Sequence, residues 1–339
     1  MDHPIFIIGT ERSGSNLLRV MLNAHSNITI PHPPHIMRFF HPLEKSYGDL
    51  KKKSNFIRLT DDILKLIKVH IHPWEIEIDR DKIYKEAIPR NVFGIFCAIY
   101  DHYARFSAKP RWGCKSTFMI EHTESIFEKY PHAQLIWLVR DPRDVAASSK
   151  NSVFNPFHPF LTATLWKRQQ ETAGALEKKL SKKNILRVHY ESLLTDTKGT
   201  VELICQFLGE ILEKDMLEFY RSEASKKASR LSESWKNTAR PILKNNAGKF
   251  LTLLNKKEIA WVESASSPVM ETLNYPPIYK QPFIRQTYYK DRLSFHLSDS
   301  LMRLKTEYRS LRYDSNHMLR WRRDALISYL NLCMRLRSV

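Results

Sequence analysis

Residues 4–18 read Pro-Ile-Phe-Ile-Ile-Gly-Thr-Glu-Arg-Ser-Gly-Ser-Asn-Leu-Leu, and this stretch decides the fold. The apolar run at 4–8 predicts a short buried strand, and a helix is expected from about Ser15. Gly9 and Gly14 let the loop between them turn tightly and aim successive amide NH groups inward. Because the positive end of the helix dipole lies beside these amides, the stretch predicts a cradle for phosphate or another oxyanion.

The two glycines have the spacing of a Walker A loop, but the residues after them differ. The Lys-Ser/Thr pair that should follow Gly14 is replaced by Ser15-Asn16, and the cation lies earlier, at Arg12. We therefore expect an oxyanion ligand other than ATP with magnesium. An ordinary strand-to-helix turn is the alternative interpretation of this loop taken alone.

A second strand, turn and helix are predicted at 135–149, which reads Leu-Ile-Trp-Leu-Val-Arg-Asp-Pro-Arg-Asp-Val-Ala-Ala-Ser-Ser. Pro142 is tolerated at or near the first position of a helix. Arg140 at the strand end and Ser148 two turns into the helix are spaced so that both can reach one phosphate. The alternative is that the charges of this turn form only surface ion pairs.

Together the two segments resemble the sulfotransferase family that uses 3′-phosphoadenosine 5′-phosphosulfate (PAPS), most closely its bacterial and carbohydrate-type branch. The resemblance implies an α/β fold of three layers, α/β/α, with a central, mainly parallel sheet like that of P-loop NTPases. It implies that the loop Arg12-Ser13-Gly14-Ser15-Asn16 cradles the 5′-phosphosulfate, and that Arg140 and Ser148 hold the 3′-phosphate. It requires no metal, and the product would be 3′-phosphoadenosine 5′-phosphate (PAP).

Three weaker matches extend this resemblance over roughly residues 1–278. Residues 185–194 resemble a third strand and the segment after it, which implies that Tyr190 lies near the adenine, where an aromatic ring can stack on the base. Residues 245–275 imply that Gly248 and Lys249 close over the 3′-phosphate. Residues 112–117 imply that Lys115 stabilises charge near the bridging oxygen of the donor.

Transfer to a hydroxyl also requires a base that takes the proton of the acceptor. Relatives use a glutamate after the first helix or a histidine two residues after the lysine; here the first loop reads Ile-Pro-His-Pro-Pro-His-Ile at 30–36 and the second position is Thr117. His32 or His35 is expected to substitute, since imidazole is a competent base near neutral pH. Glu11 is a third candidate. Arg12 and Lys115 are expected to stabilise the transferred charge.

Strand signals at 4–8, 135–139 and 185–189 alternate with helical patterns, which predicts a parallel sheet covered by helices. The expected helices include 92–107, 161–180 and 200–219. We expect a sulfotransferase domain over 1–279, in which a polar helical insert at about 40–110 supplies part of the acceptor cleft.

Residues 280–339 form a basic extension with thirteen Lys or Arg against five Asp or Glu, in a chain whose net charge is +18. Leucines and aromatic residues among these charges predict amphipathic helices. Such helices are expected to pack on the domain, on a second subunit or on an anionic membrane surface. The charge also favours an anionic acceptor such as an acidic glycan or a lipid-linked sugar.

The spacing of the cysteines and the length of the apolar runs exclude several classes of site and of protein. Cys97, Cys114, Cys205 and Cys333 lack CxxC spacing, so neither a disulfide framework nor a zinc site is indicated. No run reaches the length of a membrane span or has the order of a secretory signal, which predicts a cytoplasmic enzyme, with peripheral membrane contact through the extension. A P-loop kinase and a basic nucleic-acid-binding protein stay open as alternatives. For the favoured sulfotransferase interpretation, we expect no nucleic acid as a partner.

Overall fold

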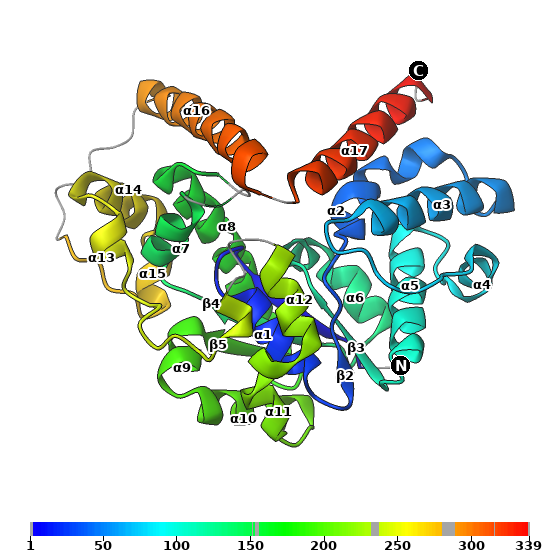
Figure 1. The fold of residues 1–339 in the computed structure, drawn as a ribbon, viewed down its shortest axis with the longest axis horizontal. Coiled ribbons are helices and arrows are strands. Elements are labelled where there is room, and N and C mark those ends of the chain that lie inside the picture. Colours follow the sequence, from blue (N-terminus) through cyan, green and yellow to red (C-terminus); the bar gives the residue numbers. More distant parts are fainter. Residues whose placement is uncertain are drawn as a thin grey trace.

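A five-stranded sheet with helices on both faces forms the centre of the protein (Figure 1). The computed structural model describes residues 3–150, 152, 156–231, 237–279, 289–314 and 316–337. Its strands are β1 (Ile5–Gly9), β2 (Ile28–Thr29), β3 (Arg111–Lys115), β4 (Gln134–Val139) and β5 (Ile185–His189). The predicted strands are confirmed as β1, β4 and β5, whereas β2 and β3 were not predicted.

All strand pairs are parallel, in the order β2-β3-β1-β4-β5. The predicted three-layer α/β/α class is therefore confirmed. The helix that follows β1, at 15–23, lies on one face of the sheet, and the helix that follows β4, at 142–149, packs on the other. The chain therefore leaves these two neighbouring strands toward opposite faces of the sheet. Ligands of open parallel sheets bind at such a switch point, at the carboxyl ends of the strands.

Helices surround this sheet along the whole chain. Before β4 they are α1 (Ser15–Asn23), α2 (Ile36–Phe40), η1 (His41–Tyr47), α3 (Lys53–Val69), α4 (Arg80–Glu86), α5 (Val92–Phe106), η2 (Thr117–His122) and α6 (Thr123–Lys129). After β4 they are α7 (Pro142–Ser149), α8 (Pro159–Lys179), α9 (Tyr190–Thr195), α10 (Thr197–Leu208), α11 (Lys214–Leu217), η3 (Phe219–Arg221), α12 (Glu223–Leu231), α13 (Phe250–Leu253), α14 (Lys256–Ser266), α15 (Val269–Thr272), α16 (Tyr289–Tyr313) and α17 (His317–Arg337).

The helix predictions at 92–107 and 161–180 are confirmed as α5 and α8. The predicted helix at 200–219 is instead two helices, α10 and α11. Gly209 causes the break, because its φ of 75° lies in the left-handed region that terminates a helix.

Alternate residues of the strands point to opposite faces, and both faces are buried. Phe6 and Ile8 point to the side covered by α2, α3, α5 and α8, whereas Ile5 and Ile7 point to the side covered by α1, α9 and α10. The sheet therefore has a hydrophobic core on each side, as expected of a parallel sheet.

The two helices of the extension, α16 and α17, point away from each other at the top of the view in Figure 1. Asp299 of α16 accepts hydrogen bonds from the backbone NH groups of Phe157 and His158, at the amino end of α8. Phe295 of α16 stacks on His158 and makes an edge-to-face contact with Trp261, and Leu330 of α17 lies in the larger core. The helical character predicted for this region is thus observed over Tyr289–Tyr313 and His317–Arg337, whereas residues 280–288, 315, 338 and 339 lie outside the described residues. No helix in the described part of the chain has the length and apolar character needed to cross a bilayer.

Candidate active site

The loop between β1 and α1 has the backbone geometry of an anion cradle. Gly9 has a φ of 139°, and a Cβ added there would lie 2.3 Å from the carbonyl oxygen of Leu138, so only glycine lets β1 lie this close to β4. Gly14 has a φ of 87° and is the N-cap of α1, where it offers no side-chain cap. The first turn of α1 contains no acidic residue. Its amide NH groups and dipole are therefore available to an anion.

A cavity of ≈ 560 Å³ opens at this cradle. Its described wall contains six cationic side chains and two carboxylates, which makes it strongly electropositive: Arg12, Lys115, Arg140, Arg240, Lys249 and Arg309 against Glu11 and Asp144. The wall also includes Gly14, Ser15, Asn16, Ser148 and Tyr190 from the predicted site. Further members come from the chain after α12: Asn237, Thr238, Pro241, Ile242, Leu243, Asn246 and Leu253. Among the predicted residues, Ser13, His32, His35 and Gly248 are not part of this wall.

The two predicted phosphate loops are joined by direct hydrogen bonds. Arg12 Nε donates to Ser148 Oγ at 3.1 Å, and Arg140 Nη1 donates to the carbonyl oxygen of Arg12 at 2.9 Å. Ser148 thus contacts Arg12 in this structure, and the prediction that Ser148 and Arg140 hold one phosphate stays a prediction. Burial and the neighbouring charge of Arg140 lower the pKa of Arg12. Two crowded cations of this kind favour a multiply charged anion.

Arg140 also connects the loops to the chain beyond α12. Its Nη2 donates to the carbonyl oxygen of Asn246 at 2.9 Å, and its guanidinium lies 4.5 Å from the centre of the Tyr190 ring. The Nε of Arg140 is buried and has no hydrogen-bond partner among the described residues. The hydroxyl of Ser13 is likewise buried without such a partner. Buried donors without partners are costly, so these atoms fit a site that is completed by a ligand oxygen.

Tyr190 packs between the two loops. A Cβ added to Gly14 would lie 2.3 Å from its ring, and its hydroxyl accepts a hydrogen bond from Asn246 Nδ2 at 2.6 Å. The residue is only 3% exposed, and Arg140 covers its ring. Tyr190 therefore supports the cradle in this structure, and its stacking on adenine stays a prediction.

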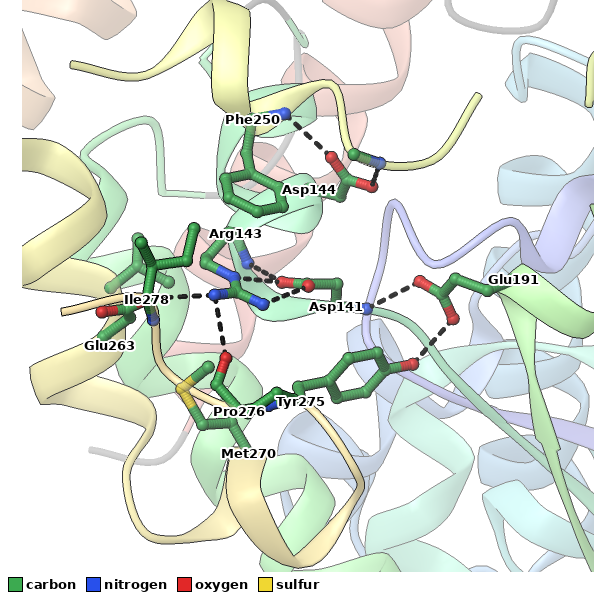
Figure 2. A network of polar contacts seen from close by, with 12 residues as sticks. Asp141, Arg143, Asp144, Glu191, Phe250, Glu263, Met270, Tyr275, Pro276 and Ile278 are labelled. Atoms are coloured by element: carbon green, nitrogen blue, oxygen red, sulfur yellow. Dashed lines mark hydrogen bonds and ion pairs between the residues drawn. The ribbon is translucent and has the colours of Figure 1, made fainter. Parts of the chain in front are cut away.

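The charged residues at the start of α7 are buried, so their interpretation as surface ion pairs is wrong. Arg143 is 5% exposed and Asp144 is 1% exposed. Figure 2 shows Arg143 bonded to both carboxylate oxygens of Asp141, to Glu263 at 2.8 Å and to the carbonyl oxygen of Pro276. This network fastens the segment after α14 to the end of β4.

Asp144 fastens a second segment to the same turn. Its two oxygens accept hydrogen bonds from the backbone NH groups of Gly248, at 2.8 Å, and Phe250, at 3.0 Å (Figure 2). It also lies 3.6 Å from Arg140. Gly248 thus contributes its backbone to closing the segment, while the side chain of Lys249 reaches the cavity wall.

Lys115 ends β3 at the cavity wall beside the loop that carries the two candidate histidines. Burial, followed by the charge of Arg19, lowers the pKa of Lys115 to about 8. Burial also lowers the pKa of His35 well below its usual value, and the charge of Lys115 is the next cause. His35 is consequently neutral, and able to accept a proton, at neutral pH.

The two histidines lie in different surroundings. His35 Nδ1 lies 3.0 Å from the hydroxyl of Ser116, the residue after Lys115, and His35 has a positive φ of 56°. Such a backbone conformation is unusual outside glycine and is concentrated at functional sites. His32 is 4% exposed and its ring lies against those of His70 and His72. Neither ring lines the cavity, but His35 is the less buried of the two and contacts the residue next to Lys115, so the base is more readily assigned to His35 and stays a prediction.

Several wall residues were not predicted. Asp144 was visible in the motif, but its partners lie more than a hundred residues further along the chain. Asn246 and Arg240 lie in an irregular segment without periodicity, and Arg309 belongs to the extension. No residue of the insert at 40–110 belongs to the described cavity wall, so its part in an acceptor cleft stays a prediction. Within the described residues, no group of three or more His, Cys, Asp or Glu side chains is placed to hold a metal ion.

Comparison with known proteins agrees with this geometry. Among solved structures, the sulfotransferase domain of the Synechococcus PCC 7002 olefin synthase has a TM-score of 0.52 and 22% identity, over 83% of this chain and 98% of that one. The sulfotransferase domain from the curacin biosynthetic pathway has a TM-score of 0.55 and 18% identity, over 81% and 99%. These two similarities show the fold.

Sequence matches identify the family. Mouse (Mus musculus) Sulfotransferase 2A1 is 35% identical over 102 residues, which span 25% of this chain and 35% of that relative. The match thus covers about a third of the relative's length. The family model described as "Sulfotransferase family" matches residues 4–214, which is more than half of the chain and contains both phosphate loops. The protein therefore belongs to the sulfotransferase family.

Proposed function

We propose that the protein transfers a sulfuryl group from PAPS to a hydroxyl of a carbohydrate or a lipid-linked glycan. The observation that carries this proposal is the joining of two phosphate loops, Arg12 to Ser148 and Arg140 to Arg12, around one electropositive cavity. PAPS carries two separate phosphate-bearing positions, and a nucleotide with a single phosphate chain would leave one loop without a ligand. Family membership favours sulfuryl transfer over the kinase and nucleic-acid alternatives.

The residues present fit this donor. The amide groups at the start of α1 and the hydroxyl of Ser13 would hold the 5′-phosphosulfate, and the free Nε of Arg140 would donate to the 3′-phosphate. Lys249, on the segment fastened by Asp144, would add a further cation. When bound, PAPS supplies the sulfuryl group and a phosphate leaving group.

The chain's own residues would supply the rest of the chemistry. His35 would take the proton of the acceptor hydroxyl as the hydroxyl oxygen bonds to sulfur, and the hydrogen bond to Ser116 would orient the ring of His35. Arg12 and Lys115 would offset the negative charge that builds up on the departing phosphate oxygen. Glu11 also lies in the cavity wall and is the second candidate for the base.

Calorimetric titration with PAP and with ATP tests the donor site. Wild-type protein should bind PAP tightly and ATP more weakly. Arg140→Ala should weaken PAP binding by about tenfold or more, because it removes charge-assisted hydrogen bonds to a phosphate. Arg221→Ala is the matched control, since this arginine is exposed and outside the cavity. Folded protein that fails to bind PAP would overturn the proposal.

A further inference from the structure

The helix α16 carries a row of large apolar side chains that face solvent. Leu297, Leu301, Leu304, Tyr308 and Leu311 are each 64–67% exposed. They recur every three or four residues, so they lie along one face of the helix. The residues that pack on the domain, among them Phe295 and Asp299, lie on the opposite face. The packing of α16 on the domain therefore leaves this row of side chains exposed to solvent.

The helix α17 repeats this arrangement. Met318, Trp321, Tyr329 and Leu332 are exposed, at intervals of three, eight and three residues, which place them on one face of the helix. Its packed face carries Leu330, Leu326 and Ile327 against the larger core. Both helices lie on the same side of the molecule (Figure 1). Each row is an exposed set of large apolar side chains, and such exposure usually marks an interaction site.

Charge distinguishes the partners that this surface could contact. Arg303, Lys305, Arg309, Arg312 and Arg322 are exposed along the same two helices. A row with this spacing can pair with a second copy in a coiled coil. Two copies of a chain with a net charge of +18 would, however, bring like charges together, whereas an anionic surface would attract them.

We propose that the exposed faces of α16 and α17 bind an anionic lipid bilayer. Leucine and aromatic side chains would enter the interface between headgroups and acyl chains, and Arg303, Lys305, Arg312 and Arg322 would lie among anionic headgroups. Arg309 extends from α16 into the wall of the donor cavity. Bilayer binding would consequently place the opening of that cavity close to the membrane, where a lipid-linked acceptor resides.

Co-sedimentation with vesicles tests this inference without any measurement of transfer. The full chain is mixed with vesicles of phosphatidylcholine alone or of phosphatidylcholine with phosphatidylserine. The protein should bind the anionic vesicles, and added salt should weaken binding. The double variant Leu301→Glu and Leu304→Glu should lose roughly tenfold or more of this binding, because two apolar anchors become anions. Ile211→Glu is the matched control, since Ile211 is 83% exposed but lies far from the extension in sequence, between α10 and α11.

Four outcomes would overturn the inference. They are absence of binding to anionic vesicles, equal binding to neutral ones, wild-type binding by the double variant, and a dimer in solution that the double variant converts to monomer. The last would show that a second copy covers the surface. Circular dichroism and thermal unfolding establish that each variant is folded. The PAP titration is independent of these results, so failure of the membrane proposal leaves the donor site untouched, and the reverse also holds.

Discussion

The substitution Asp144→Asn tests whether the segment at 246–250 completes the donor site. Both oxygens of Asp144 accept backbone hydrogen bonds, from Gly248 and Phe250, and one oxygen lies 3.6 Å from Arg140. Asparagine keeps one acceptor oxygen, but its NH2 group would face a backbone NH. The change removes one hydrogen bond to a charged group and leaves a buried donor unpaired.

The magnitude follows from this loss. Hydrogen bonds to charged groups contribute about 1.5–3 kcal/mol. If the whole loss falls on the equilibrium that closes the segment, the apparent Kd for PAP rises by roughly 10- to 150-fold. Because the segment is only one part of the fold, the loss should appear in PAP affinity more than in the unfolding temperature.

The assay is calorimetric titration with PAP, alongside thermal unfolding with and without PAP. Asp61→Asn is the matched control, since Asp61 also pairs with an arginine, Arg80 at 3.0 Å, but on the surface of α3. Its PAP affinity should equal that of wild type. An Asp144→Asn protein that is folded and binds PAP within about twofold of wild type would refute the role assigned to this segment.

Three further predictions concern the cradle and the candidate chemistry. Gly14→Ala should abolish PAP binding in titration, because the new methyl group would meet the Tyr190 ring at 2.3 Å and the backbone φ is unfavourable for alanine. His35→Ala should lower kcat by roughly 10²- to 10⁴-fold while the Kd for PAP is unchanged. The acceptor for this assay is found by screening hydroxyl compounds for PAP release. An unchanged kcat would contradict the assignment of His35 as the base. In the same assay, activity should fall as pH rises above about 8, because Lys115 then loses its proton, and Lys115→Arg should remove this alkaline limb.

The depressed pKa of His35 gives the sign of the acid limb in that pH profile. A histidine whose folded-state pKa is lowered remains unprotonated, and competent as a base, to a lower pH than a free imidazole. The acid limb should therefore lie below pH 6.5. It would disappear in a variant that has lost the base.

The two strand-turn-helix segments that carry the predicted phosphate loops could be predicted from sequence because their determinants are local. Each is a buried strand followed by a turn whose glycine or proline fixes the backbone within a few residues. The strand β3 escaped prediction because it has five residues, of which Gly113 and the two terminal cations, Arg111 and Lys115, give no apolar alternation. Its position is set by pairing with β1, which is a contact between distant segments.

The rest of the site depends on contacts that sequence patterns do not encode. Asn246 and Arg240 follow no helical or strand period, so nothing local predicts that they line the cavity. The choice between His32 and His35 required knowing that one ring is buried against two other histidines and that the other lies beside Ser116. The contribution of Arg309 required the placement of α16.

The hydrogen bonds that join Arg12, Ser148 and Arg140 have a thermodynamic consequence. Because each loop holds the other in position, we expect the free energies contributed by the two phosphate groups of the proposed donor to be coupled. In a double-mutant cycle, the effects of replacing Arg12 and Arg140 should be non-additive. For the proposed donor, affinity for the 5′-group should therefore change together with affinity for the 3′-group, and a redesign of nucleotide preference should treat both loops as one unit.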